Sequence, residues 1–379
     1  MRILLIGEYS RLHNSLKEGL VKLGHEVIIV ADSDGFKKFP VDFSIDHKFC
    51  KTKTINICRQ IISKFSGFDI AKLEQGIRFR LSLQHFKNFD VVQFINESPI
   101  KTTKPIEFYL LKKIFKFNKK IFILSCGVDY LNMKYNMENK TEKSILQPYF
   151  TNQKLKIEYA PLLKYLTSGH KKIHDLVMTR SIGIIATDFD YVSANINNSK
   201  YLGLIPYPIN LEKLTYNELP FEDKIVIFIG INKWNYNQKG ILFFEKALEI
   251  IQQKYNNKVE IIVANTIPYS TYINLYNKAH ILLDQSYSKD QGYNALEAMA
   301  KGKVVFTGAE KEFVEYYKLT DRVCINAVPN VDYLVNELSY LIENPQEIIA
   351  IGKRAKSFVE KEHNYIKIAK KYLEVWNKN

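Results

Sequence analysis

The residues best suited to chemistry lie in the second half of the chain, around Glu297. Asn294 to Ala300 is predicted to open a helix just after Gly292. Free backbone N–H groups and the positive end of the helix dipole at such a start favour a phosphate group. Glu297 is expected on the first turn, where a carboxylate can bond to two vicinal ribose hydroxyls. Alternatively, Glu297 only complements the helix dipole.

Two lysines could neutralise the same anion. Lys239 directly precedes Gly240 and a predicted helix, and it comes after a strand predicted at Ile225 to Ile229. Open α/β sheets bind ligands at strand ends of this kind, so we expect Lys239 to face the crevice and to neutralise a diphosphate bound there. Lys233 follows Gly230 by three residues and either adds a second positive charge there or is a solvated loop cation.

Candidate residues in the first half of the chain follow strand ends in the same way. A strand predicted at Ile3 to Ile6 ends at Gly7, and His13 lies shortly beyond it. Asp129 closes the segment Ser125-Cys126-Gly127-Val128-Asp129 after another predicted strand. There Asp129 could bind or orient a hydroxyl of a ligand, or it could cap a helix. His13 is a second candidate in this half of the chain.

The cysteines and the remaining histidines do not predict metal or redox chemistry. The four cysteines lie far apart except for one pair eight positions apart, which fits reduced thiols rather than a disulfide framework. Cys126 is expected to be a buried structural thiol. His170 and His174 have helical spacing, but with no acid between them in a known metal pattern we expect them on the surface. We therefore expect no metal and no cofactor.

Length and composition indicate a folded chain of two domains. The 379 residues exceed one ordinary core, and 46% hydrophobic with 25% charged residues is typical of globular proteins. We find no run of about 18 apolar residues, and Glu8 and Arg11 interrupt the apolar start. The sequence therefore predicts a cytoplasmic protein that is neither secreted nor integral to a membrane.

The net charge of +14 is concentrated before Ile205. That part has 32 Lys and Arg against 19 Asp and Glu, whereas the rest has 22 against 21. Aromatic residues are interleaved with basic runs, as around Lys112, Lys113, Lys116 and Lys119 with Lys120. Such a surface could bind nucleic acid or lie on an anionic membrane, or it could reflect the composition of the source alone.

Short aliphatic runs alternate with longer amphipathic segments, which predicts parallel sheets wrapped by helices. Two prolines within residues 204–208 indicate a connector between two similar α/β halves. We expect domains at 1–205 and 206–360, and a final helix at 361–379 that crosses back to the first half. No G-x-G-x-x-G follows the first strand, which argues against a nicotinamide or flavin oxidoreductase.

The chain resembles glycosyltransferase family 4, whose fold is the GT-B pair of Rossmann-like domains facing each other across a cleft. Three segments carry the resemblance: 204–210 at the interdomain passage, Phe228-Ile229-Gly230 with Lys239-Gly240, and the block Leu296 to Val305 around Glu297. The Gly7 turn with residues 23–27 also fits. Only the Glu297 block is specific by itself.

The resemblance implies a retaining, metal-independent transferase of the hexosyltransferase type. It implies a nucleoside diphosphate sugar as donor and a glycan or lipid-linked acceptor, in the synthesis of cell-envelope or surface polysaccharide. It assigns the donor nucleotide to Gly230, Gly292, Tyr293, Asn294, Ala295 and Glu297, the chemistry to Lys239, Lys233 and Asp290, and the acceptor side to Gly7, His13 and Asp129.

Three residues depart from the family pattern. The family pairs two glutamates eight positions apart, but Lys289 stands where the first is expected, so Asp290 or Asp284 is predicted to replace it. Lys233 replaces an arginine and cannot give its two-pronged bond. Cys126 stands where the family often has a histidine. These departures leave the donor sugar open.

Other readings fit parts of the same sequence. The basic first half could belong to a nucleic-acid-binding module, although the chain has no recognisable nucleic-acid fold signature and we expect no nucleic acid as partner. The same scaffold also carries sugar-nucleotide epimerases and phosphorylases. A degenerate protein that binds a nucleotide without turnover is a third alternative. As a transferase, the chain is expected in the cytoplasm, where it could lie peripherally on the inner face of the membrane.

Overall fold

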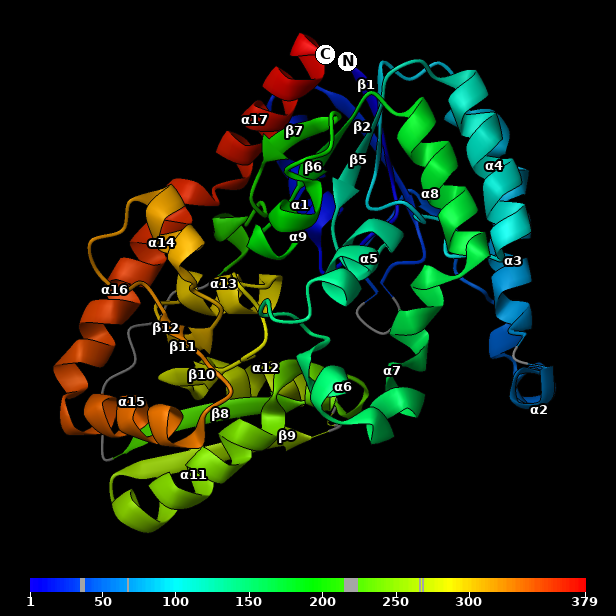
Figure 1. Cartoon of the computed structure of the whole chain (residues 1–379). Coiled ribbons are helices and arrows are strands. Elements are labelled where there is room, and N and C mark those ends of the chain that lie inside the picture. The colour runs from blue at the N-terminus through cyan, green and yellow to red at the C-terminus, as the bar shows by residue number, and fades with distance from the viewer. Residues whose placement is uncertain (35–37, 67, 215–223, 266, 268) are drawn as a thin grey trace.

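The computed structural model describes residues 1–34, 38–66, 68–214, 224–265, 267 and 269–379. Within these residues the strands form one sheet of seven strands and one of five. Each sheet is the centre of one lobe, and the lobes stand one above the other in Figure 1. The fold is therefore α/β with two Rossmann-like halves, as the sequence predicts.

The N-terminal lobe contains the seven-stranded sheet and helices α1 to α9. The strand order is β3-β2-β1-β4-β5-β6-β7, and all neighbours run parallel. The strands are β1 (Arg2–Ile6), β2 (Glu26–Ala31), β3 (Phe43–Ser44), β4 (Val91–Phe94), β5 (Ile121–Ser125), β6 (Gly183–Ala186) and β7 (Tyr201–Leu204). The helices are α1 (Leu12–Lys22), α2 (Lys53–Ser66), α3 (Ile70–Ser82), α4 (Lys104–Phe117), α5 (Tyr130–Glu138), α6 (Gln147–Thr151), α7 (Lys156–Leu163), α8 (Ser168–Arg180) and α9 (Phe189–Asn195).

The C-terminal lobe contains the five-stranded sheet and helices α10 to α16. Its strand order is β12-β11-β10-β8-β9, again all parallel. The strands are β8 (Ile225–Ile231), β9 (Val259–Asn265), β10 (Ile281–Leu283), β11 (Val304–Thr307) and β12 (Ile325–Asn326). The helices are α10 (Tyr236–Lys239), α11 (Ile241–Tyr255), α12 (Tyr269–Lys278), α13 (Tyr293–Ala300), α14 (Lys311–Tyr317), α15 (Val331–Glu343) and α16 (Pro345–Glu362), followed by α17 (Tyr365–Lys378).

Both faces of each sheet are buried, which is why the strands read as continuous aliphatic runs. In β1, Ile3 and Leu5 belong to a core that includes α1 residues, whereas Leu4 and Ile6 belong to another core under α4 and α8. In β8, Phe228 likewise faces α12 and α13, while its neighbours Ile227 and Ile229 face α11 and α15. Each sheet is therefore a rigid layer that positions the loops at its edges.

The chain crosses between the lobes twice at one place. The first crossing runs through residues 205–210 and the second through residues 363–365. Ile209 N donates to His363 O at 2.7 Å, and Tyr365 N donates to Ile209 O at 3.2 Å. His363 Nδ1 lies 2.9 Å from Tyr207 O. These hydrogen bonds hold the two crossings side by side, so the two connections between the lobes form one short ladder.

Helix α17 returns to the N-terminal lobe, beside which it lies at the top of Figure 1, and it packs on α1. A Cβ on Gly19 of α1 would lie 2.4 Å from Tyr365 O and 2.9 Å from Ala369 Cβ. The absence of a side chain at Gly19 therefore allows the close approach. Further along α17, Trp376 is fully buried near Phe122 of β5.

The structure differs from the sequence prediction mainly at short elements. The strands predicted from aliphatic runs are confirmed, but β3, β7 and the two-residue β12 were not predicted. β3 has two residues and β7 contains Gly203, which weakens a strand pattern. Leu204, predicted to open the connector, instead ends β7.

Candidate functional site

The loops that follow the strands of the two sheets meet at the boundary between the lobes. Ser15 Oγ in α1 lies 2.7 Å from Tyr293 OH in the first turn of α13. Phe189 N at the start of α9 donates to Asp290 Oδ2 at 3.2 Å. Each contact joins elements that follow strands of different sheets. The carboxyl edges of both sheets therefore face this boundary, and such edges are where open parallel sheets bind ligands.

Lys239 ends α10, and its ammonium contacts the carboxyl end of β10. Lys239 Nζ donates to Asp284 Oδ1 at 2.8 Å, with the Lys239 side chain 27% exposed and that of Asp284 3% exposed. Asp284 directly follows β10, which pairs with β8. Gly240 has φ 67°, and a Cβ there would lie 2.0 Å from Ser286 Oγ, so glycine is needed to bring α10 this close. The ion pair holds the ammonium at the carboxyl edge of the sheet.

The start of α13 borders the same loop, residues 284–286. A Cβ built on Gly292 would lie 3.7 Å from Gln285 Nε2. Gly292 is extended and is the N-cap of α13. The first backbone N–H groups of a helix have no partner within it. In α13 these groups belong to Tyr293, Asn294 and Ala295. A cation and a helix N-terminus thus adjoin one loop at the lobe boundary.

Glu297 does not lie on the first turn of α13, which corrects the prediction. The helix begins at Tyr293, directly after the extended Gly292, so Glu297 is its fifth residue. Its side chain is half-buried. Glu297 stands one turn from Tyr293 on the same helix face. Burial of the Tyr293 hydroxyl raises its pKa, and the negative charge of Glu297 raises it further. The carboxylate therefore shares the face of α13 that meets α1.

Two further predicted residues, Gly230 and Lys233, lie at the end of β8 and in the loop that follows it. Gly230 lies in β8, where a Cβ would come 2.8 Å from the ring of Tyr272. Lys233 begins a 3-10 turn, Lys233–Asn235, and is exposed beside Trp234, which is 86% exposed. The structure brings Lys239 to the buried edge of the sheet and leaves the side chain of Lys233 in solvent.

Asp290 is buried and turned toward the N-terminal lobe. Its Oδ1 accepts from Gln291 N at 2.7 Å, and its Oδ2 accepts from Phe189 N. Burial, together with the charge of Asp190, raises the pKa of Asp290 to about 7. Asp290 therefore links the C-terminal lobe to the start of α9.

Lys289 forms an ion pair with a carboxylate of the opposite lobe. Lys289 Nζ donates to Glu142 Oε2 at 2.5 Å and to Ser193 Oγ at 3.0 Å. The neighbour of Glu142 makes the reverse contact, because Lys143 Nζ donates to Glu310 Oε1 at 2.7 Å. We call these two crossed ion pairs the interlobe latch (Glu142, Lys143, Lys289 and Glu310). Sequence spacing gave no signal for it, since the partners are more than 140 residues apart.

On the acceptor side, Gly7 and His13 form one buried turn. Gly7 has φ 89°, and a Cβ there would lie 2.2 Å from Ile95 Cγ2. His13 is fully buried with its Nδ1 2.7 Å from Gly7 O. Burial lowers the pKa of His13 to about 3, so its ring is neutral. The structure brings Gly7 and His13 together, and a contact between either of them and an acceptor stays a prediction.

Asp129 caps helix α5. Its Oδ1 accepts from Asn132 N at 2.7 Å, and its Oδ2 accepts from Ser125 Oγ at 3.2 Å. Burial, with the charge of Glu97, raises the pKa of Asp129 to about 7. Cys126, in the same segment, is buried, and burial raises the pKa of its thiol. A capping role is therefore shown for Asp129, and a buried thiol is confirmed for Cys126.

Glu97 and His174 form a pair beside Asp129 that the sequence did not indicate. His174 Nδ1 lies 2.6 Å from Glu97 Oε1, and Tyr130 N donates to Glu97 Oε2 at 3.1 Å. Although burial lowers the pKa of His174, Glu97 raises it above its ordinary value. The expectation of a surface position for His174 is wrong, because α8 presents this side chain to the lobe interior. A histidine four residues after another gives no signal of a carboxylate 77 residues away.

Backbone strain collects at the loops after β1, β2 and β4. Residues other than glycine with positive φ include Ser10, Arg11, Ser33, Asp34 and Lys101. Ser10 N donates to Asp34 Oδ2 at 2.9 Å, and Lys101 Nζ lies 3.2 Å from Asp32 Oδ1 and 4.1 Å from the centre of the Tyr9 ring. Such strain gathers at ligand-binding loops. These residues are the acceptor-side candidates that sequence reasoning missed.

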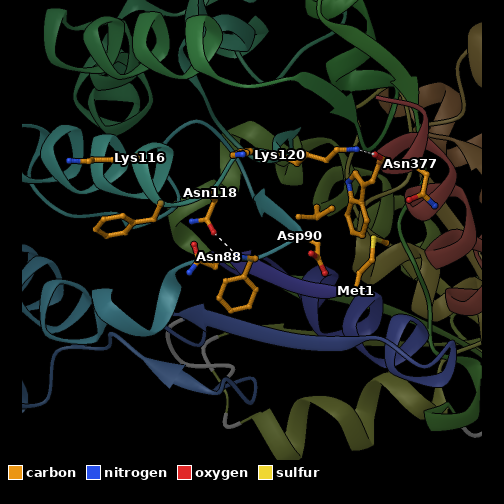
Figure 2. Close-up of a pocket in the computed structure, with 12 residues that line it drawn as sticks. Met1, Asn88, Asp90, Lys116, Asn118, Lys120 and Asn377 are labelled. Atoms are coloured by element: carbon orange, nitrogen blue, oxygen red, sulfur yellow. Dashed lines mark hydrogen bonds between the residues drawn. The ribbon is translucent and has the colours of Figure 1, made fainter.

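The basic run from Lys112 to Lys120 lies at the opposite end of the sheet. Lys116, Lys119 and Lys120 line a recess of about 750 Å³ at the start of β4, together with Met1, Asp90 and Trp376 (Figure 2). Lys120 Nζ donates to Trp376 O at 3.3 Å. The recess adjoins the amino ends of β1 and β4, so it is remote from the lobe boundary and we do not assign the donor site to it.

Among the described residues, no three or more His, Cys, Asp or Glu side chains are grouped so that they could hold a metal ion. In that same part of the chain, no helix is both long enough and apolar enough to cross a membrane.

Comparisons with known proteins agree with this geometry. Residues 237–374 match the family model described as "Glycosyl transferase-like". The chain is 28% identical to a trehalose synthase of Pyrococcus horikoshii over a matched segment of 141 residues. This segment covers 37% of this chain and 33% of that protein. The chain thus matches about a third of the length of its curated relative.

Solved structures with low sequence identity share the whole fold. A sucrose-phosphate synthase of Thermosynechococcus elongatus has a TM-score of 0.61 at 14% identity, covering 100% of this chain and 99% of that one. Anabaena HepE, in complex with UDP and glucose, has a TM-score of 0.59 at 12% identity and full coverage of both chains. A UDP-GlcNAc 2-epimerase of Neisseria meningitidis, bound to UDP-GlcNAc, has a TM-score of 0.52 at 14% identity with full coverage of both. The chain therefore has the GT-B fold, and its residues 237–374 match a glycosyl transferase-like family model.

Proposed function

We propose that the chain is a glycosyltransferase that moves a sugar from a nucleoside diphosphate sugar to a hydroxyl of a glycan or lipid-linked acceptor. The observation that carries this proposal is the pairing of Lys239 with Asp284 next to the start of α13. Both features lie within the segment that matches the glycosyl transferase-like model. They offer an ammonium and free backbone N–H groups to one diphosphate.

The chemistry proposed is stabilisation of the leaving diphosphate. Negative charge grows on its oxygens as the glycosidic bond breaks, and Lys239 with the N–H groups of α13 is already aimed at that charge. An ammonium has three protons, so Lys239 can keep Asp284 and still donate to a phosphate. Lys233 would join from the loop after β8. Resemblance supports retention of the anomeric configuration and a mechanism without metal.

Donor recognition is proposed for the face of α13 that meets α1. Glu297 would bond to the ribose hydroxyls, and Gly230 and Gly292 would let the backbone approach the nucleotide. Asp290 is proposed to contact the donor sugar, for which its Oδ2 would have to release the Phe189 N–H that it accepts from in this arrangement. Movement at the paired crossings near Tyr207 would exchange one contact for the other.

The acceptor is proposed to bind the N-terminal lobe, between the Gly7 turn and Asp129. A cell-envelope or surface polysaccharide pathway would suit an enzyme of this kind. We place the chain in the cytoplasm, with its basic N-terminal lobe against the inner face of the membrane.

A thermal-shift panel tests the donor site. We expect one of UDP, GDP, ADP or CMP, and its sugars, to stabilise the protein by about 2.7 kcal/mol at 100 times the dissociation constant. Glu297→Gln should lose most of that stabilisation. No response to any nucleotide would contradict the proposal. Loss of a donor with no acceptor present would favour an epimerase instead, as in the fold neighbour from Neisseria.

A further inference from the structure

Helix α2 exposes its apolar face and turns its polar face toward the protein. Ile57, Ile61 and Phe65 are four residues apart on one face, and they are 52%, 52% and 85% exposed. On the other side, the half-buried residues are polar, namely Asn56, Arg59 and Ser63. A surface helix of a globular protein normally has the reverse arrangement.

A two-pronged ion pair holds α2 in this orientation. Arg59 Nε donates to Asp69 Oδ1 at 2.6 Å, and Arg59 Nη2 donates to Asp69 Oδ2 at 2.8 Å. Asp69 is itself fixed, because it caps α3 by accepting from Ala71 N at 3.0 Å. Rotating α2 by half a turn to bury Phe65 would break this pair. The exposure of the apolar face is therefore part of how the helix packs.

The apolar face of α2 projects from the protein, so a flat, extended partner can reach it. In Figure 1, α2 stands at the end of α3, projecting beyond the rest of the N-terminal lobe. Phe49, in the 3-10 turn just before α2, is 68% exposed. Within residues 49–65, six large apolar side chains are exposed, namely Phe49, Ile55, Ile57, Ile61, Ile62 and Phe65. So many exposed apolar side chains in one short segment mark an interaction site rather than chance exposure.

The charge around α2 identifies the partner. Residues 48–82 contain eight Lys and Arg but only Asp69 and Glu74 as acids. Both acids are already paired, with Arg59 and Arg78. Lys53 and Lys64 are exposed at the two ends of α2. An anionic lipid surface offers an apolar layer for Phe65 and negative charge for the lysines, whereas a second copy of this chain would bring like charges together.

We propose that α2 docks the N-terminal lobe on an anionic membrane surface. Ile57, Ile61 and Phe65 enter the boundary between headgroups and acyl chains, and Lys53 and Lys64 contact the headgroups. This docking rests on the part of the proposed function that brings the lobe to a membrane, and it is independent of sugar transfer.

Cys58 provides a direct probe of the docked state. It is exposed, whereas Cys50, Cys126 and Cys324 are buried. On α2 it lies one helical turn from both Ile61 and Ile62, on the same side as Phe65. We expect an environment-sensitive fluorophore on Cys58 to shift to the blue with vesicles of phosphatidylcholine and phosphatidylglycerol, and to change little with phosphatidylcholine alone. The unlabelled protein should sediment with the anionic vesicles.

Matched variants separate docking through α2 from non-specific adsorption to vesicles. Ile61→Ser with Phe65→Ser should weaken binding to anionic vesicles at least tenfold, and Lys53→Gln with Lys64→Gln by roughly tenfold or more. Ile157→Ser, at a residue 89% exposed on α7, should bind as the parent does. Because the replaced side chains are exposed, the variants should keep the parent's thermal unfolding midpoint and its affinity for nucleotide.

The outcomes distinguish this proposal from the proposed function. A parent protein that binds nucleotide but fails to sediment with anionic vesicles would overturn the docking and leave the transferase assignment intact. Vesicle binding without any nucleotide affinity would overturn the transferase assignment and leave the docking intact. A concentration-dependent dimer that Phe65→Ser dissociates would show that the apolar face of α2 joins two copies of the chain, and would also overturn the docking.

Discussion

Lys239 Nζ lies 2.8 Å from Asp284 Oδ1, so a cation on the segment after β8 is held by a buried acid at the end of β10. The two strands are neighbours in the interior of the sheet. The position of this ammonium is therefore set by the core of the C-terminal lobe rather than by a surface loop. Such pre-organisation is what stabilisation of a departing anion requires.

Replacing Lys239 should abolish most of the activity. For Lys239→Ala we expect kcat for sugar transfer to fall by about 10² to 10³, because one preorganised charge is lost. The variant should also be less stable, since Asp284 keeps its buried carboxylate without its partner. Steady-state kinetics and chemical denaturation measure the two effects.

A second substitution separates stability from chemistry. In Lys239→Ala with Asp284→Asn, the uncompensated charge is removed, so the free energy of unfolding should recover while kcat stays low. Recovery of kcat in the double variant would show that Lys239 acts only by neutralising Asp284.

The stability of the protein should depend on pH through Asp290. Burial raises its pKa from 3.8 to about 7, so between about pH 4 and pH 7 the folded state holds a proton that the unfolded state has lost. This carboxyl therefore lowers the free energy of unfolding as pH rises through that range. Asp290→Asn does not titrate. The free energy of unfolding of this variant, relative to that of the parent, should therefore rise by roughly 2 to 3 kcal/mol between pH 5 and pH 8. If urea denaturation gives the same difference in unfolding free energy between the two proteins at pH 5 and at pH 8, Asp290 does not have a raised pKa in the folded state.

The interlobe latch should bias the protein toward closure. Glu142→Gln with Lys143→Ala removes both crossed ion pairs but no buried apolar contact. Each partly exposed pair contributes about 0 to 1 kcal/mol, so the lobes should separate without unfolding. Small-angle scattering should show a larger radius of gyration than for the parent, and added nucleotide should reduce it. An unchanged radius would mean that other contacts hold the lobes.

The packing of α17 on α1 should depend on Gly19. Gly19→Ala places a Cβ 2.4 Å from Tyr365 O, so α17 must shift, and we expect a loss of about 1 to 3 kcal/mol in stability. Val21→Ala, at a residue of the same helix that is 51% exposed, is the control and should change little. Equal unfolding midpoints for the two variants would indicate that α17 is loosely attached.

Sequence reasoning predicted the architecture well because the sheets are buried on both faces. Runs such as Ile3 to Ile6 and Ile281 to Leu283 are aliphatic at every position, which few other structures require. Short edge strands such as β3 leave no comparable pattern. The helix start after Gly292 was also predicted, but at Asn294 instead of Tyr293, and this difference of one residue makes Glu297 the fifth residue of α13.

Contacts between distant segments could not be predicted from one sequence. The carboxylate beside Lys289 comes from Glu142, and the partner of His174 is Glu97; neither spacing follows a helical or strand period. Charge counting located the basic half of the chain but pointed to Lys112 to Lys120, which lie away from the lobe boundary. The unusual exposure of Phe65 is a property of how α2 is oriented, and an amphipathic pattern alone does not say which face turns outward.

The most direct test of the account is titration calorimetry of nucleoside diphosphates into the parent, Lys239→Ala and Lys246→Ala, the last replacing an exposed lysine of α11 in the same lobe. We predict that one nucleoside diphosphate binds the parent and Lys246→Ala with equal affinity and binds Lys239→Ala at least tenfold more weakly. Equal affinity for all three proteins would contradict the placement of the diphosphate between Lys239 and the start of α13.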